Sequence, residues 1–205
     1  FRAREEDEAQ PRHLDDNVLA VPTLAMDALE REVGRTGHLA LQLARSALAG
    51  AEVAALAREE AVVARLDAAV EAFVERMSRG AMPQGTAERL ARTLRVQRYH
   101  ETTAEQALAA APLRPPAAGG AEVEARHGAF VEQAHALLIL CDPTQGEADA
   151  AAIDSALQAS EVAYQDLKTA LLAAGATGNV HVADMEAALR RYSAMRRAVQ
   201  QAAKA

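Results

Sequence analysis

The chain has 205 residues, of which 50% are hydrophobic, and this is enough for one large or two small domains with real cores. Its formal net charge of −7 argues against nucleic acid as a partner, because a surface that follows phosphates needs an excess of basic side chains. Alanine is abundant, Trp is absent, and Phe and Tyr number three each, so closely packed helices are favoured over strands.

The first half of the chain, residues 21–111, has the apolar spacing of three long helices. The first helix should stop at Gly50, a residue suited to a left-handed helix end. The second has apolar residues at three- and four-residue steps between Val63 and Met77. The third follows Pro83 and should run to the end of this half.

A boundary follows at "PLRPPAAGG", residues 112–120, where prolines and glycines forbid a continuous helix. Residues 121–205 repeat the plan with three more helices, and Thr144 and Glu147 have capping-box spacing before the middle one. After a charged lead-in over residues 1–20, we therefore expect an all-α fold of six long antiparallel helices in two three-helix bundles.

An internal repeat relates the last helices of the two halves. Residues 94–107 align without a gap with residues 189–202, and Leu, Arg, Gln and Ala recur at the same positions. The aligned segments differ in charge, because Arg196 and Gln200 stand where the first half has the carboxylates described next.

Those carboxylates are Glu101 and Glu105, which lie one helical turn apart on one face. Their β-carbons should be about 6 Å apart, close enough to share a hard cation if a neighbouring helix adds oxygens. A solvated helix face is the alternative interpretation. His100 points about 100° away around the helix, so we do not expect it to be a third ligand.

Two Glu-x-x-His motifs, Glu124 with His127 and Glu132 with His135, have the ligand spacing of di-iron helical bundles. Both motifs lie on one predicted helix and no other helix supplies a matching pair, so surface residues at helical spacing are the simpler interpretation. Cys141 ends an apolar run and is expected to be a buried, unreactive thiol.

Four arginines on the last helix could contact phosphate, an acidic lipid surface or an acidic partner helix, or could complement the helix dipole. These residues are Arg190, Arg191, Arg196 and Arg197.

The segment "YHETTAEQA", residues 99–107, resembles the acidic motif Asp-Leu-Glu-Arg-Ile-Gly-Asp-His-Ala of PhoU-like proteins. Glu101 and Glu105 fall on the motif's Glu and second Asp, whereas Tyr99 replaces its leading acid. The opening "RHLDDNVLAVPTLAMDAL" is similar to the start of the PhoU-like domain that follows the membrane part of bacterial sodium/phosphate cotransporters.

The resemblance implies a non-enzymatic regulatory domain involved in phosphate transport, with a divalent metal ion bound through Glu101 and Glu105 and, more weakly, Glu60. Because a guanidinium cannot ligate a cation, Arg196 restricts the metal to the first bundle. The implied partner is the transporter's membrane domain at the inner face of a bacterial membrane, and a second copy of the chain is a further candidate.

The start of the chain and its cysteine content bear on where the protein would lie in the cell. The chain starts at Phe1 rather than Met, so we expect the membrane part upstream in the same polypeptide. A lone cysteine, no signal peptide and no bilayer-length apolar run favour the cytoplasm. A metal-dependent bundle enzyme and a helical partner-binding module stay open as alternatives.

Overall fold

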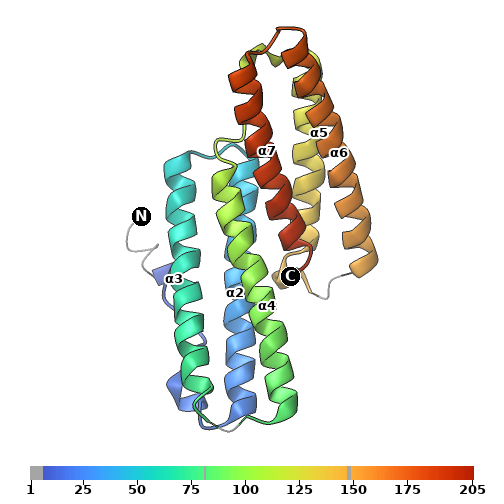
Figure 1. Cartoon of the computed structure of the whole chain (residues 1–205). Coiled ribbons are helices and arrows are strands. Elements are labelled where there is room, and N and C mark those ends of the chain that lie inside the picture. The colour runs from blue at the N-terminus through green and yellow to red at the C-terminus, as the bar shows by residue number, and fades with distance from the viewer. Residues whose placement is uncertain (1–6, 81, 147–148) are drawn as a thin grey trace.

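The computed structural model describes residues 7–80, 82–146 and 149–205, and Figure 1 shows that it is built from helices. The chain is 81% helical, and the described residues contain no strand, so the predicted all-α fold is confirmed. The six long helices are α2 (Pro22–Leu48), α3 (Val53–Met77), α4 (Gln84–Ala109), α5 (Gly120–Leu140), α6 (Ala150–Ala176) and α7 (Val182–Ala202).

The helices form two three-helix bundles, α2–α4 and α5–α7, in which successive helices run antiparallel (Figure 1). The predicted linker, residues 112–120, contains the short 3-10 turn η2 (Ala117–Gly119), and α5 starts directly after that turn. The bundles also pack on each other, because α4 lies along α7 and α2 contacts α5.

The end of α2 and the start of α6 illustrate the local chemistry of helix ends. Gly50 after α2 has φ 75°, the left-handed conformation that glycine adopts without a steric cost. The expected capping box at Thr144 is wrong, since α6 begins later and the Asp149 side chain accepts from the backbone N–H groups of Ala151 and Ala152. Thr144 belongs instead to the turn η3 (Pro143–Gln145), and Glu147 lies outside the described residues.

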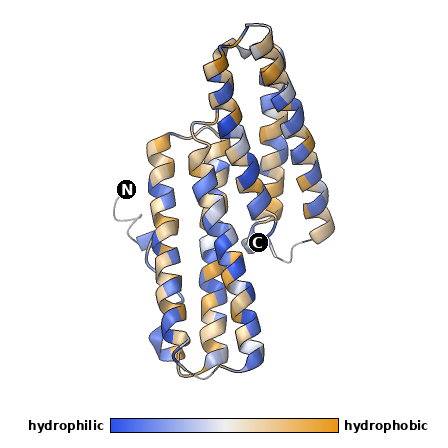
Figure 2. Ribbon diagram, in the orientation of Figure 1, coloured by the Kyte–Doolittle hydropathy of each residue, from blue (hydrophilic) through white to orange (hydrophobic). Residues whose placement is uncertain are grey.

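The core is continuous between the bundles. One buried cluster includes residues of both halves. Phe130, Tyr164 and Tyr192 form its aromatic part, and the ring centroids of Tyr164 and Tyr192 lie 6.1 Å and 5.9 Å from that of Phe130. Figure 2 shows hydrophobic and hydrophilic residues mixed along each helix, as expected for amphipathic helices, in which apolar residues recur on the same face every three or four residues. A second cluster, with Met26 and Phe73, fills the far end of the first bundle.

A buried carboxylate joins the second bundle to α2. Asp142, which follows α5, is 2% exposed, and its oxygens lie 2.9 Å from His38 Nδ1 and 3.4 Å from Arg45 Nη2. The Thr144 hydroxyl and backbone N–H also donate to it. Burial alone would raise the pKa of Asp142, but the hydrogen bonds from His38 and Thr144 hold this pKa below its usual value.

A second buried carboxylate holds the N-terminal lead-in. Glu32 on α2 is fully buried and accepts the backbone N–H groups of Arg12 and His13, both at 2.8 Å. Arg35 donates to the other oxygen at 2.7 Å. These bonds satisfy a charge that would otherwise be costly to bury, so the segment before α2 is part of the fold.

Two glycines one turn apart on α2 should respond in opposite ways to alanine. A Cβ at Gly37 would lie 2.4 Å from Nε2 of the buried His100, whereas a Cβ at Gly34 would meet nothing within 4 Å. We expect Gly37→Ala to lower the free energy of unfolding by about 2 kcal/mol through overpacking. Gly34→Ala should raise it by up to about 1 kcal/mol through helix propensity. Urea unfolding followed by circular dichroism measures both, and equal effects would contradict this packing.

The contact between the bundles should depend on the charge of Asp142. Asp142→Asn keeps the size of the side chain but weakens its bonds to His38 and Arg45, so we expect a loss of about 2 kcal/mol. Asp154→Asn on α6 is the control, because Asp154 is exposed. Equal stability of the two variants in urea would show that the Asp142 contacts contribute nothing.

Candidate functional site

Five carboxylates meet in one groove between α3 and α4, which we call the acidic groove. It has a volume of about 180 Å³ and includes Glu60, Asp67 and Glu71 from α3 and Glu101 and Glu105 from α4. The three predicted site residues, Glu60, Glu101 and Glu105, therefore line the same groove.

Asp67 and Glu71 were missed by the sequence analysis, although their spacing carried a signal. Positions 60, 67 and 71 are seven and four residues apart, which places them on one face of a helix. Only the packing of α3 on α4 shows that this face meets Glu101 and Glu105.

The groove strongly shifts the pKa of Asp67. Burial, together with the charges of Glu101, Glu71, Glu105 and Glu60, raises the pKa of Asp67 to about 7. Its Oδ1 atom is buried and has no hydrogen-bond partner among the described residues. Arg98 gives Glu101 an ion pair at 3.0 Å, but this pair lies at the exposed edge of the site. The groove therefore lacks positive charge where its carboxylates are most crowded.

The carboxylates of the acidic groove do not converge closely enough to form a closed metal-binding site. No group of three or more His, Cys, Asp or Glu side chains within the described ranges is arranged to hold a metal ion directly. The groove is thus an open acidic surface between two helices.

The equivalent place in the second bundle contains a built-in cation. Arg196, which the repeat aligns with Glu101, donates to Glu161 of α6 at 2.6 Å and lies over the Tyr164 ring at 5.0 Å. Gln200, aligned with Glu105, donates to the same Glu161 oxygen at 3.3 Å. A guanidinium therefore bridges the second and third helices of this bundle, whereas the residues that line the acidic groove include five carboxylates and no basic side chain.

The four arginines of α7 do not form one patch. Arg190 and Arg197 line a hollow of about 470 Å³ together with Lys168, whereas Arg191 and Arg196 are not part of its lining. Arg197 also donates to Gln106 of α4 at 2.8 Å, so part of this cluster joins the two bundles.

The Glu-x-x-His motifs of α5 are used differently from di-iron ligands. His127 Nδ1 lies 2.8 Å from the hydroxyl of the buried Tyr192. Glu124, Glu132 and His135 are exposed on the helix surface. Three of these side chains therefore lie on the surface, whereas His127 is half-buried and packs on the second bundle's core.

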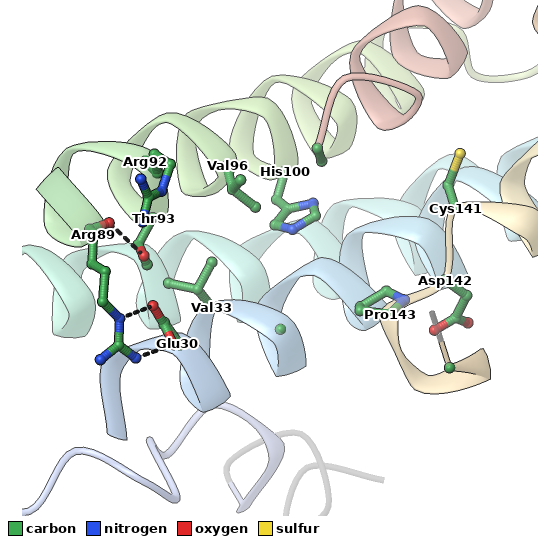
Figure 3. A pocket seen from close by; sticks show the side chains of 13 residues that line it. Glu30, Val33, Arg89, Arg92, Thr93, Val96, His100, Cys141, Asp142 and Pro143 are labelled. Carbon is green, nitrogen blue, oxygen red and sulfur yellow. Dashed lines mark hydrogen bonds and ion pairs between the residues drawn. The ribbon is translucent and has the colours of Figure 1, made fainter. Parts of the chain in front are cut away.

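A separate pocket of about 390 Å³ lies between the bundles, and we call it the inter-bundle pocket (Figure 3). α2 contributes Val33 and Gly34, α4 contributes a stripe that ends at His100, and the segment after α5 contributes Cys141. Burial lowers the pKa of His100 to about 4 and raises the pKa of Cys141 to about 11, so both groups are uncharged near neutral pH.

Comparison of the chain with models of known families, with characterised proteins and with solved structures finds no significant match. Within the described part of the chain, every helix is too short or too polar to span a bilayer.

The raised pKa of Asp67 predicts that the free energy of unfolding depends on pH. Between its ordinary value of 3.8 and about 7, folded Asp67 keeps a proton that the unfolded chain releases, so the free energy of unfolding should fall as pH rises through this range. Asp67→Asn removes the charge. We expect this variant to be more stable than the parent by about 1 to 2 kcal/mol at pH 8 and nearly equal to it at about pH 4, after allowance for partial exposure.

The measurement is urea unfolding with a chelator present, so that no divalent cation neutralises the groove. Asp154→Asn, at an exposed position on α6, is the control and should change the pH dependence little. A constant difference between parent and Asp67→Asn across this range would contradict the assignment.

Proposed function

We propose that the chain is a non-enzymatic regulatory domain of the PhoU-like kind that acts on a phosphate transporter and binds a divalent cation in its acidic groove. The observation that carries this proposal is the convergence of five carboxylates from α3 and α4 around the partly buried Asp67. A cation would neutralise a cluster that otherwise retains a proton near neutral pH.

The open geometry suits an ion that keeps some of its water. Mg²⁺ and Mn²⁺ are held by a few carboxylates and several water molecules rather than by a closed cage of side chains. Glu101 and Glu105 would contact such an ion from α4, while Glu60 and Asp67 would contact it from α3.

The second bundle supports the proposal by contrast. The Arg196–Glu161 ion pair supplies a permanent cross-link between α6 and α7. In the first bundle the cross-link between α3 and α4 would form only when a cation is present. A cation could thus change the rigidity of one bundle while the other stays constant, which is what a regulatory domain requires.

The chemistry of two partly buried groups, Cys141 and His127, favours binding over catalysis. The pKa of Cys141 is raised to about 11, so the thiolate that a nucleophile requires is scarce at neutral pH. His127 is hydrogen-bonded to Tyr192 rather than to a carboxylate that would activate it as a base.

Calorimetric titration with MnCl₂ tests the proposal. The parent should bind Mn²⁺ saturably at pH 8 and at least several-fold more weakly at pH 6, because the proton on Asp67 competes with the ion. Glu101→Gln combined with Glu105→Gln should abolish binding. Glu124→Gln with Glu132→Gln, a pair exposed on α5, is the matched control and should bind like the parent.

Failure of the parent to bind Mn²⁺ at saturating concentrations would overturn the cation site. Unchanged binding by the Glu101/Glu105 double variant would do the same.

A further inference from the structure

The inter-bundle pocket lies apart from the acidic groove, and its walls come from both bundles. On α4 its lining residues Arg89, Thr93, Val96 and His100 are spaced by four, three and four residues, so they form one stripe along the helix. Figure 3 shows this stripe facing Val33 of α2, with Cys141 and Pro143 on the other side of the pocket.

The end of the pocket at His100, which we call the inner end, has a buried polar atom without a hydrogen-bond partner in the described part of the chain. His100 is 4% exposed, and its Nδ1 atom is buried without a hydrogen-bond partner among the described residues. Its ring projects from α4 toward α2 (Figure 3). Gly37 of α2 leaves room for the ring, because a Cβ at that position would lie 2.4 Å from His100 Nε2. Buried polar atoms are nearly always hydrogen-bonded, so this nitrogen indicates a partner that the chain does not itself provide.

The outer end has a guanidinium without an ion pair to any described residue, that of Arg92. Arg89 is paired with both Glu30 at 2.7 Å and Asp27 at 2.9 Å, and Asp142 is held by His38 and Arg45. Arg92 also lines the pocket, and no ion pair joins it to any described residue. Arg92 is therefore the lining guanidinium that remains available for a ligand, and a guanidinium forms a two-point contact with a carboxylate.

The walls between these two ends are apolar. Val33, Val96, Pro143 and the protonated thiol of Cys141 supply them, and the open volume is within the range of small-molecule sites. Arg92 and His100 are eight residues apart, or roughly 12 Å along the helix axis. The reach of the arginine side chain shortens the span that a ligand must cover.

We propose that the inter-bundle pocket binds a small organic carboxylate with a flat or compact apolar body and one polar atom at its far end. The carboxylate pairs with Arg92, the apolar body lies between Val33 and Val96, and the far polar atom hydrogen-bonds to His100. Such a ligand contacts α2, α4 and the segment after α5 at once, so its binding would favour one arrangement of the two bundles. This site goes beyond the cation site and does not depend on it.

The probe is 6-hydroxy-2-naphthoate, whose intrinsic fluorescence reports binding and whose hydroxyl and carboxylate lie at opposite ends of an apolar body. We expect saturable binding to the full chain in the presence of EDTA, with 2-naphthoate weaker by about tenfold and neutral 2-naphthol weaker still. EDTA keeps the test independent of the acidic groove, so failure of one site says nothing about the other.

Gly34→Leu is the decisive variant, because a side chain at Gly34 enters open space in the pocket wall without removing any contact. It should abolish binding of the probe while unfolding at least as late as the parent. Gly128→Leu on α5, where a side chain also meets open space, is the matched control and should bind normally.

Arg92→Gln should weaken binding of 6-hydroxy-2-naphthoate at least tenfold. Arg95→Gln, at an exposed position three residues later on the same helix and outside the pocket lining, should leave it unchanged. No saturable binding by the parent, undiminished binding by Gly34→Leu, or equal affinity for 2-naphthol and the acid would each overturn the proposal.

Discussion

Helix α4 packs against three helices at once, and the rest of the structure depends on how closely it approaches them. The small residues Ala104 and Ala107 of α4 are buried, and toward α7 the Thr103 hydroxyl lies 3.4 Å from the backbone oxygen of Ala198. Toward α2 the ring of His100 lies against Gly37, with no space for a methyl group. Alanine and glycine permit these short distances between helix axes, because larger side chains would separate the backbones.

This central position lets α4 take part in every site. Its α3-facing side carries Glu101 and Glu105, and its α2-facing side carries His100. Its α7-facing side meets the other bundle at Thr103 and Ala198, two positions that the internal repeat aligns. A ligand at either site would therefore act on the helix that joins the two bundles, and coupling between the sites would need only a small change in its packing.

The two bundles differ in how the carboxylates between their second and third helices are compensated. Between α6 and α7, Arg196 compensates Glu161 permanently, and the Tyr164 ring covers the guanidinium. Between α3 and α4 the carboxylates are left without a guanidinium at the centre, and Asp67 keeps its proton instead. One repeat unit thus has an internal guanidinium at this place, whereas under our proposal the other would respond to proton or cation concentration.

The sequence by itself determined the six helices, because apolar spacing and the glycines and prolines between segments are local signals. It also placed Glu101 and Glu105 on one face, and the repeat identified Arg196 as the residue that replaces Glu101. The resemblance to PhoU-like proteins rests on the sequence alone. The start of α6 was misjudged because Asp149 competes with Thr144 for the same capping role, and Thr144 is bonded to Asp142.

Only the tertiary structure decided which faces meet. Asp67 and Glu71 joined the acidic groove because α3 turns that face toward α4. His100 fits beside α2 because a glycine, Gly37, lies opposite it. Asp142 connects the second bundle to α2 through His38 and Arg45, which lie 97 residues or more before it in the chain. Contacts of this kind depend on the packing of helices far apart in sequence, about which helical periodicity carries no information.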